Sequence, residues 1–409
     1  MPSVAVIGGG LAGLSCAIEL ARQGMDVDLF EAAPVLGGRT RSMFDAVTAT
    51  WFDNGPHLLV GAYHATRNWL DSCGLESCIH WQPTLRLSLW EAQRGHFDLA
   101  PQANLPLWLA LPVALVRLQG HGWQDLPALS RLLSCHPHVG ETVEAWMKRL
   151  HVPAPLARDL LTPLCLGAMN ESPSTADANS FSRVLRLSFA NHEHARLGWF
   201  RAPLQKALID PLDLLARDLG VRIHLQTRIT TIEGRRGHMT LGDRQGRQWQ
   251  ANLVVDTKPD TRGPSRPITS IHLWFEQNIR LPNPMIGGLG TTGHWFFDTS
   301  QQMNERNNLA HLAVVISASA PKQKNELVRQ VCSEIGSMLD MPPPEPFHHR
   351  IICERRATRL VQSRSKSTYP DGIIPAGEAP VPGELPATIE LAVQRGIGAA
   401  RRADMLLHA

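Results

Sequence analysis

Three glycines and one acid near the N-terminus have the spacing of a site for phosphates and a ribose. Gly8, Gly10 and Gly13 follow an apolar run, and Glu31 stands eighteen residues after the last glycine. The first glycine permits a tight turn, the second lets a pyrophosphate approach the backbone, and the third lets a helix pack on a strand. An acid at this spacing can bind a ribose diol. The pattern predicts a dinucleotide site and by itself does not separate FAD from NAD.

A strand, a turn, a helix and a second strand are needed to position these residues. Residues 4–7 form an apolar run, a helical pattern extends from Leu11 to Gly24, and a second apolar run over residues 27–30 ends at Glu31. Such a helix directs its free N–H groups and the positive end of its dipole at phosphates. The order predicts an α/β fold with a Rossmann-like nucleotide-binding domain.

The sequence pattern changes several times along the chain, which predicts that this domain is discontinuous. Residues 86–204 are rich in Leu, Trp and Pro, and residues 205–262 return to a helix followed by alternating strands. We predict a nucleotide-binding domain built from residues 1–85, 205–262 and 350–409. An α+β substrate-binding domain, residues 86–204 and 263–349, would be inserted into it.

Two more glycines and an arginine follow the second predicted strand at once. Gly37 and Gly38 let the chain pass close to a cofactor, and Arg39 offers a planar fork of donors to phosphate or ribityl oxygens. At this motif the chain resembles the superfamily of FAD-dependent amine oxidases and phytoene desaturases, in which GGR follows the ribose acid. The resemblance implies that the cofactor is FAD.

A second motif of that superfamily is the segment DNGPHLL at residues 53–59. In the superfamily the corresponding segment runs beside the isoalloxazine ring, which implies that Asn54 and Gly55 bind the flavin. His57 can donate or accept a proton near neutral pH, so it is the first candidate for a catalytic residue. A loop histidine bonded to the backbone is the alternative interpretation.

The third motif lies near the C-terminus, where an apolar strand leads into a Pro- and Gly-rich loop and a long helix. The helix opens at residues 385–388, LPAT, and its free N–H groups can face the N1/C2=O edge of a flavin. In the superfamily a second flavin segment occupies this place, and Glu378 can bind a ribityl hydroxyl. The remaining predicted cofactor-binding residues are Ile229, Gly377, Glu378, Ala387, Thr388 and Ile389.

One branch of the superfamily is more closely matched than the rest. The strings LFEAAPVLGGRTRS, DNGPHLLVGAY, LCLGAMNESP, SIHLWFEQNIRLP and LPATIELAVQRG resemble the hydroxysqualene dehydroxylases of bacterial hopanoid biosynthesis. The resemblance implies that reduced FAD converts hydroxysqualene to squalene. The proton donor is predicted to be His57. Asn170 and Arg201 are further candidates because they are polar residues within apolar or aromatic stretches of sequence. The family usually has Gln where Pro56 stands and Asp where Glu378 stands.

Two other functions stay open at this point. A carotenoid-type desaturase acting on phytoene or dehydrosqualene could use the same frame, because flavin chemistry runs in both directions. A non-catalytic flavin- or isoprenoid-binding protein is the alternative from another class. The expected partners are an isoprenoid lipid of the hydroxysqualene type and upstream squalene-synthase-like enzymes.

Composition narrows the remaining classes. The 409 residues carry a net charge of +3 and no Lys/Arg-rich run, which argues against a nucleic-acid partner. The seven cysteines include no C-x-x-C pair and no zinc spacing, so reduced thiols, a cytoplasmic location and no metal are predicted. The N-terminus has no basic region of the kind that precedes a secretory signal.

One segment is unusually apolar. Residues 105–118, LPLWLALPVALVRL, are too few to span a bilayer and include two prolines. Two interpretations are equally supported: a helix that lies in the membrane interface near a lipid tunnel, on the inner face of the cytoplasmic membrane, or a buried core helix.

Overall fold

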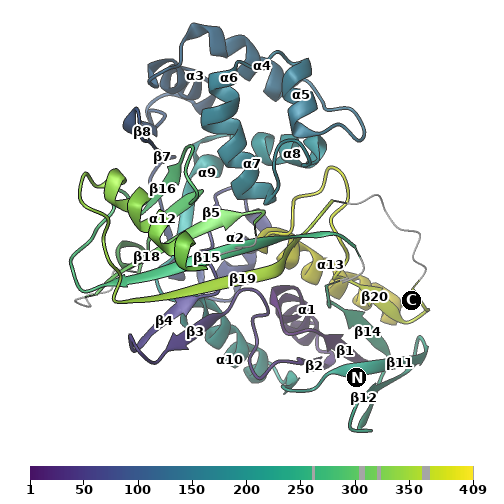
Figure 1. Ribbon diagram of the computed structural model, residues 1–409. Helices are drawn as coiled ribbons and strands as arrows, with labels where there is room; N and C mark the ends of the chain where they lie inside the picture. The colour runs from purple at the N-terminus through teal and green to yellow at the C-terminus, as the bar shows by residue number, and fades with distance from the viewer. Residues whose placement is uncertain (260–262, 304–308, 320–323, 362–368, 409) are drawn as a thin grey trace.

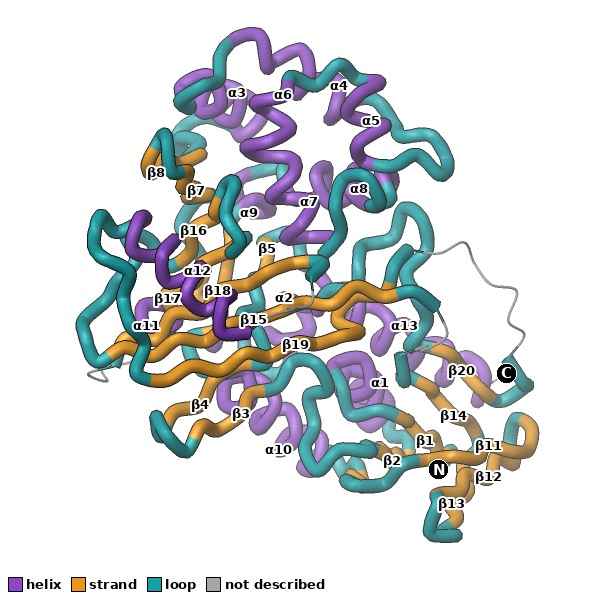
Figure 2. The backbone as a smooth tube through the Cα atoms, viewed as in Figure 1, coloured by secondary structure: helices purple, strands orange, loops and turns teal. Residues whose placement is uncertain are grey.

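The protein consists of a nucleotide-binding layer, a central mixed sheet and a helical lobe at the opposite end (Figure 1). The structure is a computed structural model and describes residues 1–259, 263–303, 309–319, 324–361 and 369–408. Figure 2 shows the long strands of the central sheet running between the helical lobe and the nucleotide-binding layer.

The nucleotide-binding layer is a five-stranded parallel sheet in the order β10-β2-β1-β14-β20. Its strands come from distant parts of the chain: β1 (Ser3–Ile7), β2 (Asp26–Phe30), β10 (Arg222–His224), β14 (Leu253–Asp256) and β20 (Ile373–Pro375). Helices α1 (Leu11–Arg22) and α13 (Ile389–His408) pack so closely that a Cβ on Gly396 would lie 2.0 Å from Ser15 Oγ. The predicted α/β, Rossmann-like fold is confirmed, since strands from both ends of the chain share this sheet.

The central sheet has seven strands in the order β19-β15-β18-β17-β16-β7-β8. These are β7 (Leu87–Glu91), β8 (Gly95–Leu99), β15 (Ser265–Phe275), β16 (Met285–Gly288), β17 (Trp295–Asp298), β18 (Ala310–Ser317) and β19 (His348–Arg359). Helix α12 (Lys324–Met338) buries Val331 and Ile335 in one core with Ile271 and Val314. Because β19 pairs with β15 along its length, residues 350–359 belong to this sheet, and the predicted boundary at residue 350 lies too early.

Smaller elements connect the two sheets. One is a hairpin of β3 (Ser42–Asp45) and β4 (Thr50–Asp53). Two are three-stranded sheets: β5 (Leu59–Val60), β9 (Leu197–Phe200) and β6 (Ile79–Trp81) form the first, and β11 (Ile229–Arg235), β12 (His238–Asp243) and β13 (Gln248–Ala251) form the second. The others are the helices α2 (His64–Ser72), α10 (Asp210–Asp218) and α11 (Thr299–Gln302). A π-helical turn at Gln205–Ile209 leads into α10, and a 3₁₀ turn at Glu76–Cys78 precedes β6.

The helical lobe buries a leucine-rich core around Trp146 and Phe181. Its elements are α3 (Leu107–Arg117), α4 (Leu126–Ser134), α5 (Val143–Arg149), α6 (Ala154–Leu156), α7 (Thr162–Met169), α8 (Ala178–Ser188), α9 (His192–Ala195), a 3₁₀ turn at Trp123–Asp125 and a π-helical turn at Ala157–Leu161. Residues 105–118 contain α3, which has a buried side and an exposed tryptophan. Leu111 and Leu115 are buried, whereas Trp108 is 76% exposed.

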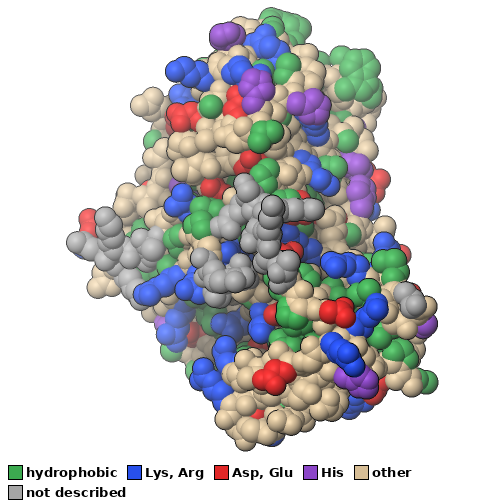
Figure 3. All heavy atoms as spheres, turned by 90° about the vertical axis from the view of Figure 1, so that its right-hand side faces the viewer, with side chains coloured by type: hydrophobic (Ala, Val, Ile, Leu, Met, Phe, Trp, Pro, Cys, Tyr) green, Lys and Arg blue, Asp and Glu red, His purple; other side chains and the backbone are tan. Residues whose placement is uncertain are grey.

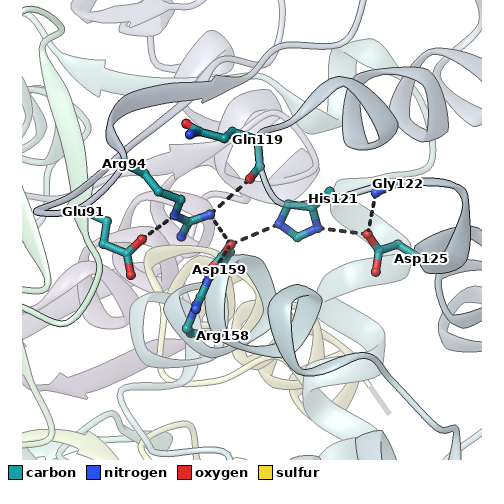
Figure 4. Close-up of polar contacts among 8 residues, drawn as sticks. All are labelled: Glu91, Arg94, Gln119, His121, Gly122, Asp125, Arg158 and Asp159. Carbon is teal, nitrogen blue, oxygen red and sulfur yellow. Dashed lines mark hydrogen bonds and ion pairs between the residues drawn. The ribbon is translucent and has the colours of Figure 1, made fainter.

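A buried charge network ties the base of the lobe together (Figure 4). Asp159 Oδ2, which is fully buried, accepts from Arg94 Nη1 at 2.6 Å and pairs with His121 Nε2 at 3.1 Å. The other ring nitrogen of His121 lies 3.0 Å from Asp125 Oδ2. Burial raises the pKa of Asp159, but hydrogen bonds from Arg158, Arg94 and His121 outweigh it and bring the pKa to about 2. The network thus joins the β7–β8 hairpin to the π-helical turn and the loop after α3.

Candidate cofactor and substrate site

The glycine turn after β1 has the shape of a cradle for a pyrophosphate. A Cβ on Gly13 would lie 1.8 Å from the carbonyl oxygen of Gly8, so only glycine lets α1 pack this closely on the strand. Gly8 itself has a φ of +108°, in the region that favours glycine. A Cβ on Gly10, by contrast, would meet no atom within 4 Å. Helix α1 also begins without a side-chain cap, so its first N–H groups remain available to an anion.

Glu31 lies directly beside this turn. Its two carboxylate oxygens accept hydrogen bonds from the N–H groups of Gly9 and Ala33, each at 2.7 Å. The backbone N–H of Thr227 donates to the Glu31 carbonyl at 2.8 Å, which brings the segment before β11 alongside. Ile229 starts β11 and packs in one cluster with residues of β1 and β2. Glu31 and the start of β11, with Ile229, therefore lie at the same end of the sheet.

Gly37 and Gly38 lie against the glycine turn. The N–H of Gly37 donates to the Gly9 carbonyl at 2.8 Å, and a Cβ on Gly38 would lie 3.3 Å from the Cα of Gly10. Arg39 follows, is exposed, and donates from Nη1 to the Ala357 carbonyl of β19. The bond from Arg39 to Ala357 brings β19 of the central sheet beside residues 37–39.

The segment 53–57 crosses from β4 to the central sheet. A Cβ on Gly55 would lie 2.7 Å from Ser270 Oγ on β15, so Gly55 permits this close passage. His57 Nδ1 lies 2.7 Å from the Gly55 carbonyl; because a carbonyl only accepts, Nδ1 carries the proton. Burial lowers the pKa of His57, and the charge of Arg39 lowers it further. His57 is therefore neutral at neutral pH, with a lone pair on Nε2.

The C-terminal motif closes the site from the other side. A Cβ on Gly377 would lie 1.9 Å from the carbonyl oxygen of Lys258, so the loop after β20 passes directly beside the end of β14. Helix α13 begins at Ile389, one residue after Thr388, whose Oγ1 accepts from the N–H of Leu391 at 3.3 Å. Glu378 is exposed. Ala387, beside Thr388, is half-buried, whereas Ile389 is buried.

The other two candidate proton donors do not lie with His57. Asn170 is buried and left-handed at the end of α7, where its amide donates to the Pro267 carbonyl at 3.2 Å and accepts from the Ala318 N–H at 2.7 Å. Arg201 is exposed, and its backbone N–H donates to the Cys78 carbonyl. Asn170 ties the helical lobe to β15 and β18, and neither residue lines the pocket that contains His57.

That pocket has an empty volume of about 370 Å³ and lies between the 53–57 segment, β9 and the central sheet. Its walls include two histidines that the sequence analysis did not select, His272 of β15 and His311 of β18. Aromatic and thioether groups complete much of the wall, with Trp199, Phe200 and Met303. His272 opens the string HLWF within the motif that carried the family resemblance, so a signal was present in the sequence.

The two sheet histidines form a buried pair. His272 Nδ1 lies 3.1 Å from His311 Nε2, and the side chains are buried. Burial lowers the pKa of His272 to about 3, and burial together with His272 holds the pKa of His311 well below its ordinary value. Both rings are therefore neutral at physiological pH. Among the described residues, no group of three or more His, Cys, Asp or Glu could hold a metal ion, and the seven cysteines are free thiols.

The architecture and the site define a flavin-dependent oxidoreductase. Residues 11–259 match the model of the flavin-containing amine oxidoreductases, and the chain belongs to that family. It is similar to the hydroxysqualene dehydroxylase of Rhodopseudomonas palustris, with 28% identity over 100% of this chain and 99% of that protein. The hydroxysqualene dehydroxylase of Sinorhizobium fredii is 26% identical over 99% and 98% of the two chains.

Solved structures support the same fold. An oxidoreductase from Methanosarcina mazei superposes with a TM-score of 0.74 at 15% identity, covering 98% of this chain and 100% of that one. The prediction of FAD as the cofactor is confirmed by the family. The residues present fit it: Gly10 leaves open space in which a pyrophosphate would lie, α1 begins there without a side-chain cap, and Glu31 beside the turn would bind the ribose.

Proposed function

We propose that the protein removes the hydroxyl group of hydroxysqualene and releases squalene, using reduced FAD. The observation that carries the proposal is one pocket lined by His57, from the segment that the family resemblance places beside the flavin, and by two neutral histidines of the central sheet. Similarity to hydroxysqualene dehydroxylases over the whole chain supports the same substrate. Upstream squalene-synthase-like enzymes would supply it in the cytoplasm.

A second cavity suits the hydrocarbon part of such a substrate. It lies in the helical lobe, has an empty volume of about 520 Å³ that includes space open to solvent, and is lined by eleven leucines and Phe189. Burial of a hydrocarbon chain contributes roughly 0.8 kcal/mol per CH₂, so affinity is readily supplied by such walls. Selectivity for an alcohol must then come from polar groups outside this cavity. The pocket lined by His57, His272 and His311, which we call the histidine pocket, offers such groups.

In this mechanism the chain positions the alcohol and handles one proton. Reduced FAD, when bound, supplies hydride to the carbon that loses oxygen. Trp199, Phe200 and Met303 form the apolar part of the pocket wall and would limit water there. His57 Nε2 is the atom that would hold a proton for the departing oxygen, because Nδ1 is committed to the Gly55 carbonyl.

The test is anaerobic. Protein containing reduced FAD should turn yellow when hydroxysqualene is added, with squalene as the product by mass spectrometry. His57→Ala should retain FAD but slow reoxidation by roughly a hundredfold. The lowered pKa keeps His57 mostly neutral between about pH 8 and about pH 6. Its protonated fraction therefore grows throughout this range as the pH falls, and the wild-type rate should rise with it.

Other outcomes point to the alternatives. Desaturated products from phytoene or dehydrosqualene with oxidised protein would indicate a carotenoid-type desaturase. Colourless protein that FAD does not reconstitute would indicate a non-catalytic protein. An unchanged rate in His57→Ala would remove His57 as the proton donor while leaving the reaction in place.

We further propose that the outer face of α3 lies in a membrane interface. Trp108 and Trp123 are 76% and 74% exposed, and tryptophan favours the headgroup level of bilayers. On the opposite side of the lobe, which Figure 3 shows, hydrophobic side chains lie among Lys, Arg and His side chains. No helix in the described part of the chain is long and apolar enough to cross a bilayer.

Vesicle binding checks this placement. The double variant Trp108→Ser, Trp123→Ser should sediment with phospholipid vesicles at least roughly tenfold more weakly than wild type, because two large apolar side chains no longer enter the interface. Leu214→Ser is the matched control, since Leu214 is 62% exposed on α10 in the nucleotide-binding layer. Equal binding by all three proteins would contradict the placement.

A further inference from the structure

One ring nitrogen in the histidine pocket has an unmet hydrogen bond. His272 is 1% exposed, and its Nδ1 is held by His311 Nε2 at 3.1 Å. Its Nε2 is buried and has no hydrogen-bond partner among the described residues. A buried polar group without a partner is costly, and His272 is one of the residues that line the pocket, so a ligand held there is placed to supply the bond.

The surrounding contacts fix the ring in this orientation. Phe52 meets His272 edge-on with ring centroids 5.0 Å apart, and Trp274 stacks on His311 at 4.4 Å with an angle of 10° between the planes. The backbone of His311 is held as well, because its carbonyl accepts from Thr299 Oγ1 at 2.6 Å and its N–H donates to Ser300 Oγ at 2.9 Å. Neither ring can turn freely to satisfy Nε2 elsewhere.

The unmet atom suits an alcohol in particular. The His272–His311 bond needs one proton, and its position decides whether His272 Nε2 is a donor or an acceptor. A hydroxyl group both donates and accepts, so it satisfies Nε2 in either case. A hydrocarbon satisfies it in neither case. Because burial keeps both rings neutral, a carboxylate or phosphate would find no countercharge on them.

We propose that His272 Nε2 binds the hydroxyl group of the lipid substrate and makes this site selective for the alcohol over its hydrocarbon product. The inference rests on the proposed function and deepens it, since it names the residue that distinguishes substrate from product. His311 is a positioning residue that orients the His272 ring. Loss of the hydroxyl would end the contact and favour release of the product.

Three substitutions separate the hydroxyl contact from the structural role. His272→Phe keeps the ring volume without either nitrogen. His272→Asn places an amide where Nδ1 bonds His311 but nothing where Nε2 stands, whereas His272→Gln places an amide at the Nε2 position. His294→Phe is the matched control, because His294 accepts from the Ser317 N–H at 3.0 Å beside the same sheet and does not line the pocket.

The measurement is the ratio of dissociation constants for squalene and hydroxysqualene, from tryptophan fluorescence of the oxidised, FAD-loaded protein. Wild type and His294→Phe should prefer the alcohol. The preference should fall roughly tenfold or more in His272→Phe and His272→Asn, with squalene affinity unchanged, and return in His272→Gln. FAD content reports whether each variant is folded, and if His272→Phe does not fold, His272→Asn carries the test.

The outcomes are distinguishable. A full preference for the alcohol in His272→Asn, equal loss in all variants including His294→Phe, or no preference in wild type would overturn the contact. If wild type prefers hydroxysqualene without converting it, and His272→Phe and His272→Asn lose that preference, the proposed reaction fails while the contact stands. If wild type converts it and the His272 variants keep the preference, the contact fails while the reaction stands.

Discussion

Gly10→Ala should lose FAD while the protein stays folded. Gly10 has φ −77° and ψ −178°, an extended conformation that alanine adopts without strain, and its Cβ would meet no protein atom within 4 Å. The added methyl group would instead occupy the space that a pyrophosphate needs beside the backbone. We expect the dissociation constant for FAD to rise at least roughly a hundredfold, because the phosphates lose several N–H contacts at the start of α1.

Two other glycines give the controls. Gly398→Ala adds a methyl group to α13, also with no atom within 4 Å, and should leave FAD binding unchanged. Gly13→Ala should reduce soluble, folded protein, because its Cβ would lie 1.8 Å from the Gly8 carbonyl oxygen. The measurement is the ratio of flavin absorbance to protein absorbance after gel filtration, with circular dichroism to report the fold. Full retention of flavin by Gly10→Ala would refute the assigned pyrophosphate position.

The nucleotide end of the site is predictable from sequence because it is local. Gly8, Gly10, Gly13 and Glu31 lie within one strand-helix-strand unit, and the parallel pairing of β1 with β2 follows from their order. The approach of Gly37 to Gly9 is explained in the same way, because Gly37 lies a short segment after Glu31, and the Glu31 carboxylate accepts from the Gly9 N–H. Glycine is required at these places for steric reasons, so its spacing carries geometric information.

The histidine pair is not predictable in this way. His272 and His311 come together because β15 pairs antiparallel with β18 in a register that places Trp274 opposite His311. Many registers suit two apolar strands, and the sequence shows only that each strand contains a histidine. The pairing of β19 with β15 is non-local too, which explains why the predicted boundary at residue 350 lies too early.

Asn170 shows how a polar residue in apolar text is ambiguous. Such a residue is expected where chemistry occurs, and equally where a helix ends, because asparagine tolerates the left-handed conformation and satisfies free backbone groups. Asn170 has a φ of +54° at the end of α7 and bonds the backbone of two strands. The sequence shows that a polar side chain stands here, and only the fold distinguishes a catalytic role from a role in ending the helix.

Asp159→Asn should destabilise the helical lobe more than a surface substitution would. The Asp159 side chain is fully buried, whereas that of its partner Arg94 is 13% exposed. Removing the carboxylate charge leaves the buried Arg94 with Glu91 as its remaining carboxylate partner; breaking a buried pair typically costs about 3–5 kcal/mol, so a loss at the lower end, about 3 kcal/mol, is expected. The free energy of unfolding in urea, followed by tryptophan fluorescence, should fall by about this amount.

The matched control is Asp98→Asn, which breaks the ion pair with Arg86 on the surface. Those side chains are 26% and 57% exposed, so the loss should stay below about 1 kcal/mol. Leu160 and Leu161, next to Asp159 in the chain, line the apolar cavity, so the Asp159→Asn protein should also bind squalene more weakly at temperatures where it still retains FAD. A change in unfolding free energy no larger than that of Asp98→Asn would show that the network does not stabilise the lobe. The cavity would then owe its shape to the leucine packing alone.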